Sequence, residues 1–430
     1  MAKSLAPVER TFLSAVILLG FTGQLAWTVE NMYLNVFVYD TITDSPHVIA
    51  LMVGISALAA TLAALLIGAL SDRVGTRRPF IVFGYLIWGV LTASFGFVQR
   101  NDGTVQAVAI AVISIVLLDA IMSFFGAGAN DGAFNAWVTD STDEGNRGRV
   151  DAILQVMPLI AMLVVFGALD SFTQDGNWKA FFGIVGGVVI LVGIGSWFLV
   201  KDAPTIKKSS EPYFGSLVYG LRVSTIRKHT ALYVTLLAWA VVSTSTQVFM
   251  PYLIIYIQRR LQMDNYPLIL ASVIIASSVI SVLGGRVIDH VGKVTSILPA
   301  TAMMIAGCFG MFFARGTGTV ILCGTLVFGG MMLSTAAIAA TVRDHTPIER
   351  VGMVQGLRMV AMVLIPMWIG PFVGAQVISG AGETYFDLGV EKQVPTPWIF
   401  VAAGVIAFLV ILPVNWLRRL ERKLNADPVG

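Results

Sequence analysis

Four ionisable residues lie inside long apolar stretches of the chain: Glu30, Asp119, Asp131 and Arg358. A charged side chain within a membrane-spanning helix is costly, and it usually marks a substrate or ion path. We therefore take Glu30 and Asp119 as candidates for coupling transport to a proton, with a structural, hydrogen-bonded acid as the alternative for Glu30. Arg358 lies about two helical turns from Arg350, which favours a side chain that extends to the membrane surface over one that binds an anion.

Polar residues of the first apolar stretch repeat at helical spacing. At about 100° per residue, Gln24, Trp27, Thr28, Asn31 and Asn35 share one face. An aromatic ring beside amide donors and acceptors suits a polyhydroxylated ligand. We expect Gln24, Trp27, Asn31 and Asn35 to bind substrate.

Two later stretches carry further candidates. Asp119 and Asn130 share a helical face, whereas Asp131 lies about 120° from Asp119, so these residues do not all line one cavity. In the seventh stretch we select Trp239 and Gln247 as substrate-binding candidates. The hydroxyl residues between them are expected to bond their own helix backbone.

The elements that would position these residues are membrane-spanning helices. The chain has 430 residues, of which 56% are hydrophobic and 12% charged, whereas a soluble protein is about 25% charged. A spanning helix needs roughly 20 mostly apolar residues. Twelve such stretches occur near 11–39, 48–70, 79–99, 105–137, 150–170, 179–200, 229–257, 267–287, 295–314, 318–341, 351–380 and 397–417.

A charged segment divides these stretches into two sets of six. We expect an N-terminal six-helix bundle over 1–200, a cytoplasmic linker over 201–228 and a C-terminal six-helix bundle over 229–430. Lysine and arginine fall mainly in the segments on one side of this map, which places both termini in the cytoplasm. We expect a multi-pass protein of the plasma (inner) membrane that acts as a monomer and binds no nucleic acid.

No motif of the sequence predicts an enzyme. There is no nucleotide-binding loop, no metal-ligand spacing and no nucleophile elbow. Cys308 and Cys323 both lie in apolar runs, which favours buried thiols over a metal or redox site. We therefore expect no cofactor besides a coupling proton.

A short loop motif recurs in the second half. The first copy runs from Gly68 to Arg78 and the second from Gly285 to Lys293, with Gly, Asp and Gly at the same spacing. A second echo relates Asp140 to Asp344, each following a later apolar stretch. Two echoes in the same order predict two similar halves.

The first loop, Gly-x-x-x-Asp-Arg-x-Gly-x-Arg-Arg, resembles the signature of the major facilitator superfamily. The resemblance implies an all-α membrane protein of twelve transmembrane helices in two pseudo-symmetric bundles, which expose a central site alternately to each side. It also implies that this loop latches the two halves together on the cytoplasmic side, with Gly68 allowing close helix approach. The residues expected to act in the gate are Gly68, Asp72, Arg73, Gly75, Arg77, Arg78, Asp289 and Gly292.

The segment 131–140 resembles the fourth helix of the glycoside–pentoside–hexuronide transporters, which implies that Asp131 binds sugar; a place in the gate is the alternative. That branch carries its cation on acidic residues of the second helix, and the corresponding segment here, 59–64, has none. Segment 71–81 also resembles sucrose transporters, which are commonly proton-coupled. We expect a proton-coupled secondary transporter of a sugar, glycoside or similar small polar solute. A drug–proton antiporter exporting hydrophobic compounds, a non-transporting sensor and a channel are the alternatives.

Overall fold

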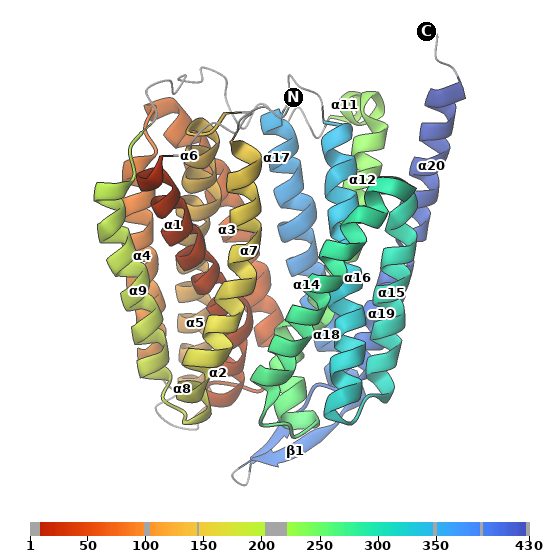
Figure 1. The fold of residues 1–430 in the computed structure, drawn as a ribbon. Helices are drawn as coiled ribbons and strands as arrows, with labels where there is room; N and C mark the ends of the chain where they lie inside the picture. Colours follow the sequence, from red (N-terminus) through yellow and green to blue (C-terminus); the bar gives the residue numbers. More distant parts are fainter. Residues whose placement is uncertain are drawn as a thin grey trace. The chain divides into compact units, whose positions relative to one another are not determined.

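The computed structural model describes residues 9–98, 104–143, 146–202, 222–346, 351–387 and 390–426. Within these ranges, twelve helical spans are long and apolar enough to cross a membrane (Figure 1). The prediction of a helical protein with twelve spans is therefore confirmed. Residues 203–221 of the predicted linker lie outside the described residues.

The chain forms two compact units. Unit 1 comprises Met1–Thr43 and Ile55–Tyr213, and unit 2 comprises Asp44–Gly54 and Phe214–Gly430. One helix, α3 (Pro46–Val74), contributes its first turns to unit 2 and the rest to unit 1.

Unit 1 holds the other five spans of the first half. They are α1 (Arg10–Thr28), η1 (Val29–Tyr33) and α2 (Leu34–Thr41); α4 (Arg78–Ser94) and η2 (Phe95–Phe97); α5 (Val105–Ala127), η3 (Gly128–Phe134) and α6 (Asn135–Asp140); α7 (Arg147–Val164), η4 (Val165–Leu169) and α8 (Asp170–Gln174); and α9 (Trp178–Leu199).

Unit 2 holds the six spans of the second half and a short helix that precedes them. They are α11 (Val223–Lys228); α12 (Thr230–Phe249), η5 (Met250–Tyr252), α13 (Leu253–Ile255) and η6 (Tyr256–Arg260); α14 (Tyr266–Val291); α15 (Lys293–Phe313); α16 (Thr317–Asp344); α17 (Val351–Met359), η8 (Val360–Leu364) and α18 (Ile365–Ala381); and α19 (Trp398–Phe408) and α20 (Ile411–Ala426).

A small antiparallel hairpin joins α18 to α19. Strand β1 (Thr384–Asp387) pairs with β2 (Val390–Gln393), with Thr384 opposite Gln393. These strands were not predicted, since only helices were expected. Hydropathy detects long apolar runs, and two four-residue strands of mixed composition between two spans leave no such signal.

Among the residues that the structure describes, five spans contain π-helical stretches: η1, η3, η4, η6 and η8. A π-helix places more residues in each turn than an α-helix does, and it is often found at functional sites. η1 and η3 contain Glu30 and Asp131 respectively. These stretches therefore change the helical register beside two of the predicted site residues.

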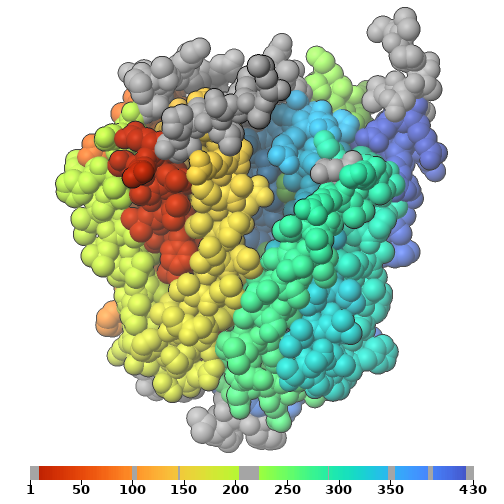
Figure 2. Space-filling view, viewed as in Figure 1, coloured from red at the N-terminus to blue at the C-terminus, as the bar shows by residue number. Residues whose placement is uncertain are grey.

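Small residues let the helices within a unit approach closely. A Cβ atom added at Gly186 of α9 would lie 2.5 Å from the carbonyl oxygen of Gly89 in α4, too close for any side chain. Such contacts between small residues are typical of helices packed in membranes. In unit 2, α14 forms part of the surface seen in Figure 2 and exposes large apolar side chains such as Leu268 and Val282, as expected where lipid is the solvent.

Candidate substrate and proton sites

The polar face of the first span is partly preserved in the structure. Gln24, Trp27 and Asn31 are each partly exposed, whereas most residues between them are buried. The Trp27 ring packs against Trp88 of α4 with ring centroids 5.1 Å apart, which fixes its orientation. These three residues are the accessible polar and aromatic groups with which α1 and η1 can contact a ligand.

Asn35 does not belong to that accessible face. Its side chain is fully buried, and its amide nitrogen donates to the Asn31 carbonyl oxygen at 2.8 Å. The structure therefore does not place Asn35 with the other three residues, and its role in binding substrate stays a prediction that assumed an unbroken α-helix. Asn31 lies inside η1 and Asn35 lies just after it, so the angle between them differs from that of an unbroken α-helix.

Two buried carboxyl groups, those of Glu30 and Asp119, interact electrostatically in the core of unit 1. Glu30 is 7% exposed and Asp119 is 1% exposed. The Ser123 hydroxyl donates to Glu30 Oε1 at 2.6 Å, and Ser56 of α3 hydrogen-bonds to Asp119. Asp119 is the ionisable neighbour with the largest electrostatic effect on Glu30.

Each of these carboxyl groups keeps one oxygen without a partner. Glu30 Oε2 and Asp119 Oδ1 are both buried and accept no hydrogen bond. In the part of the chain that the structure describes, no salt bridge joins either group to a basic side chain. Two charges of the same sign cannot be buried together cheaply without a cation, so the pair is suited to hold a proton.

A second polar group surrounds Asp131 in η3. The Asn130 amide donates to Asp131 Oδ1 at 2.9 Å. The Tyr85 hydroxyl lies 2.9 Å from both Asn130 Oδ1 and the Leu19 carbonyl oxygen, either of which can accept its one proton. Asp131 is partly exposed, so it remains accessible to a ligand. Gly23 makes room for this group, since a Cβ there would lie 2.4 Å from Asn130 Oδ1.

Sequence reasoning missed Ser56, Tyr85 and Ser123, which position the acids. Each lies in an apolar run, where a hydroxyl most often bonds its own helix. Periodicity places residues on the face of one helix and does not show which residue of another helix they meet. A buried tyrosine with a hydroxyl that needs a partner is the one signal that the sequence offered.

Arg77 is the centre of the loop motif in unit 1. It is 4% exposed, and its guanidinium donates to Asp72, to Asp140 Oδ2 at 3.0 Å and to Ser71 Oγ at 2.5 Å. The Asp202 carboxylate accepts hydrogen bonds from the backbone N–H groups of Arg77 and Arg78.

The two other arginines of the loop are placed differently. Arg73 is exposed. The Arg78 guanidinium lies 4.4 Å from the centre of the Trp197 ring and donates to the Trp197 carbonyl oxygen. Arg77 thus ties the loop to α6, and Arg78 ties it to α9.

The two motif glycines of this loop have different roles. Gly75 has a φ of +77°, a left-handed conformation that favours glycine. A Cβ added at Gly68 would meet only the Gly132 Cα, at 3.9 Å, so Gly68 is not what allows the helices to approach. That expectation is wrong. The close contact depends on Gly132 of η3, where a Cβ would lie 3.1 Å from the Ala64 carbonyl oxygen.

Unit 2 repeats the ion pair of unit 1. Lys293, the last residue of the second copy of the motif, donates to Asp344 Oδ1 and Oδ2 at 2.7 and 2.6 Å. Asp344 is the echo of Asp140, the partner of Arg77. Gly292 has a φ of +99°, as Gly75 has a positive φ. The Asp289 side chain lies outside the described residues.

The seventh span presents its candidates unequally. Gln247 is partly exposed, but Trp239 is 1% exposed and lies beside the Arg358 guanidinium, 5.2 Å from the ring centre. The Trp239 ring is thus covered in this structure, and its role in binding substrate stays a prediction. Arg358 packs against this ring and does not simply extend to the membrane surface. Ser245 donates to the Ala403 carbonyl oxygen of α19 rather than to its own helix.

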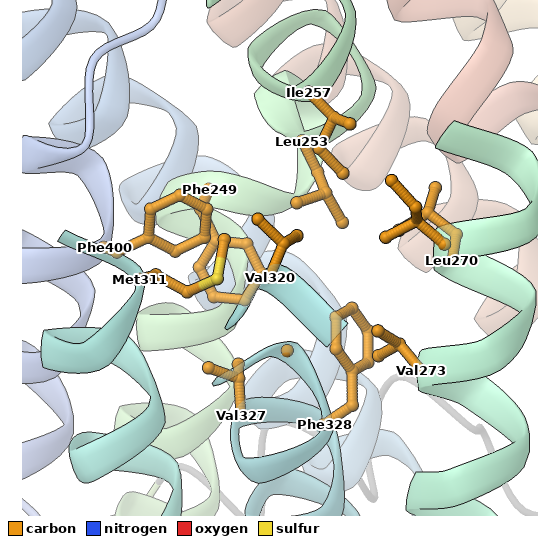
Figure 3. Close-up of a pocket in the computed structure, with 12 residues that line it drawn as sticks. Phe249, Leu253, Ile257, Leu270, Val273, Met311, Val320, Val327, Phe328 and Phe400 are labelled. Atoms are coloured by element: carbon orange, nitrogen blue, oxygen red, sulfur yellow. The ribbon is translucent and has the colours of Figure 1, made fainter. Parts of the chain in front are cut away.

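A cavity within unit 2 is too small to hold a transported solute. Apolar side chains from α12, α14, α15, α16 and α19 enclose about 20 Å³, and Phe249, Met311 and Phe328 point toward it (Figure 3). This volume is comparable to the space that one water molecule needs. We therefore place the candidate sites on the polar groups described above.

Comparison with known proteins follows this geometry. The family model described as Major Facilitator Superfamily matches residues 16–364. A bacterial homologue of the human lysosomal transporter Spinster, in an inward-facing and occupied conformation, is 16% identical with a TM-score of 0.71; the match covers 96% of this chain and 98% of that one. A variant of the nucleoside transporter NupG is 12% identical with a TM-score of 0.72, covering 94% and 99%. No match was found among curated protein sequences.

Proposed function

Because the chain belongs to the Major Facilitator Superfamily of membrane transporters, we propose that it carries a small polar solute, a sugar or glycoside, together with a proton. It is a multi-pass secondary transporter and not an enzyme. The solute and the coupling ion are the parts that we infer from its residues.

The observation that carries the proton proposal is the Glu30–Asp119 pair. Both carboxyl groups are buried, each has an oxygen without a partner, and Ser123 and Ser56 hold the other side of the pair. A buried acid without a basic partner in the described chain is a natural proton carrier in a membrane protein. Protonation would remove the repulsion between the two groups.

The solute proposal rests on the accessible polar face of unit 1. Gln24, Trp27 and Asn31 combine an aromatic ring with amide groups, and Asp131 is a partly exposed carboxylate. Sugars are commonly bound by stacking on an aromatic ring and by hydrogen bonds to amides and carboxylates. The resemblance of segment 131–140 to sugar transporters supports the same assignment for Asp131.

We also propose that the Arg77 cluster and its counterpart at Lys293 belong to the cytoplasmic gate. Both clusters join a motif loop to the end of a later span through one ion pair. An ion pair can exchange partners when helices move, which suits a latch. These loops lie on the cytoplasmic side if both termini are in the cytoplasm, as the distribution of basic residues predicts. We assign the protein to the plasma membrane as a monomer.

Uptake by reconstituted protein tests the coupling. Proteoliposomes with an inward proton gradient would be given a panel of radiolabelled sugars. We expect saturable uptake that the gradient accelerates, and loss of that acceleration in Glu30→Gln and Asp119→Asn. Solute exchange without a gradient should survive in both variants, since an amide resembles a protonated carboxyl group. Asp151→Asn, at an exposed position of α7, is the matched control.

Two results would contradict the proposal. Unchanged acceleration in both amide variants would exclude Glu30 and Asp119 as the proton site. Absence of saturable sugar flux, together with efflux of a hydrophobic cation such as ethidium, would identify a drug–proton antiporter instead. Counterflow distinguishes a carrier from a channel. A carrier takes up labelled solute in exchange for unlabelled solute that leaves the vesicle, whereas an open pore does not couple the two movements.

A further inference from the structure

Arg358 is a positively charged residue within a membrane span, and it has no acidic partner in the described part of unit 2. It lies in the last turn of α17, within the span Val354–Ala381. Its guanidinium lies 5.2 Å from the centre of the Trp239 ring and donates to Gln355 Oε1 at 3.2 Å. Neither contact neutralises its charge.

Two N–H donors at this point have no acceptor. Arg358 Nε and Trp239 Nε1 are both buried and form no hydrogen bond. Trp239 itself is 1% exposed. A buried donor without an acceptor costs about 1–3 kcal/mol, so the site is stabilised by any ligand that brings oxygen atoms to both groups.

The charged neighbour of Arg358 increases this demand. Arg343, near the end of α16, acts on Arg358 electrostatically with the same sign. Among the described residues, no salt bridge joins Arg358 to an aspartate or glutamate. One unneutralised guanidinium and two buried donors without acceptors, together in a helical bundle, favour a bound anion.

We propose that Arg358 and Trp239 bind an anionic oxygen group, a carboxylate or a phosphate, carried by the transported solute. The guanidinium offers parallel N–H groups that match a carboxylate or phosphate, and the indole N–H adds a third donor. This inference rests on the proposed function, since it specifies the chemistry of the solute. It makes the solute an acidic rather than a neutral sugar derivative.

A lipid headgroup presents the same chemistry as an acidic solute, because Arg358 lies near a helix end. The two sources are separated by supplying each alone. Purified protein would be titrated with gluconate and with glucitol, its neutral counterpart. In a second arm, phosphatidylglycerol and phosphatidylcholine would be added in mixed micelles. Thermal unfolding measures binding in both arms.

The variants isolate the proposed donors. Arg358→Gln removes the charge, Trp239→Phe keeps a ring but removes the N–H, and Arg286→Gln changes an exposed arginine of the same unit as a control. We expect gluconate to stabilise the native protein more than glucitol does. Its affinity should fall about tenfold or more in Arg358→Gln and less in Trp239→Phe. Arg286→Gln should bind gluconate as the native protein does.

Equal stabilisation by gluconate and glucitol, or an unchanged gluconate affinity in Arg358→Gln, would overturn the inference. So would stabilisation by phosphatidylglycerol alone through Arg358, since the anion would then be a lipid. Uptake assays separate this failure from that of the proposed function. Proton-driven transport of neutral sugars that Arg358→Gln leaves intact would refute the acidic solute and keep the transporter assignment. Gluconate binding that depends on Arg358, without uptake of any sugar, would support the anion site and refute the proposed transport of sugars.

Discussion

Replacing Arg77 by glutamine should destabilise unit 1 by about 2–3 kcal/mol. Removing one partner of a fully buried ion pair costs about 3–5 kcal/mol, because the other charge is left unpaired. Here the Arg77 side chain is 5% exposed, but the Asp72 and Asp140 side chains are 35% and 27% exposed. Water can solvate the two carboxylates after the substitution, which reduces the cost. The lost hydrogen bond to Ser71 Oγ adds to it.

Arg73→Gln provides the matched control for this substitution. Arg73 lies in the same loop and has the same chemistry, but it is exposed, so its replacement should change stability by less than about 0.5 kcal/mol. Unfolding followed by tryptophan fluorescence in detergent micelles should show Tm lowered by roughly 5–10 °C in Arg77→Gln. If both variants unfold at the same temperature, the buried ion pairs do not stabilise this unit and the reasoning is wrong.

Two other substitutions test packing and a buried hydrogen bond by the same measurement. Gly126→Ala should cost about 1–3 kcal/mol, because its Cβ would lie 2.7 Å from the Trp88 ring, whereas Gly187→Ala, which has open space, should cost less; equal effects would mean that the helices separate freely. Tyr33→Phe should cost about 1.5–3 kcal/mol, since the hydroxyl donates at 2.8 Å to a buried Asp170 carboxylate; a native Tm would show that Asp170 is satisfied without it.

Hydropathy predicted all twelve spans for a physical reason. A segment that crosses lipid must form its backbone hydrogen bonds internally, as a helix does, and must carry mostly apolar side chains, so each span leaves a long apolar run in the sequence. The repeated loops likewise predicted that Asp140 and Asp344 occupy corresponding positions in the two halves. Each of these aspartates forms an ion pair with a basic residue of its motif loop, Arg77 in the first half and Lys293 in the second. These features depend on local composition and spacing, which a single sequence contains.

Contacts between spans could not be predicted in the same way. The bond between Ser123 and Glu30 joins residues far apart in the chain, and nothing in either segment specifies the other. The π-helical stretch before Asn35 could not be predicted either, because such a stretch has no clear residue signature. Trp239 lies in the predicted seventh span, but the guanidinium that packs on its ring belongs to another span, which the sequence does not indicate.

The π-helical stretch at η1 is a place where the first span can change length while its two ends keep their relative orientation. A π-helical turn holds about one residue more than an α-helical turn, so removing one residue from this stretch would let it become α-helical with about the same total rotation. The segment that follows would keep its place, including the contact of its neighbour Tyr33 with Asp170. A one-residue deletion should therefore be tolerated better within η1 than within α1, and a homologue with a one-residue gap here would keep the same orientation of α2.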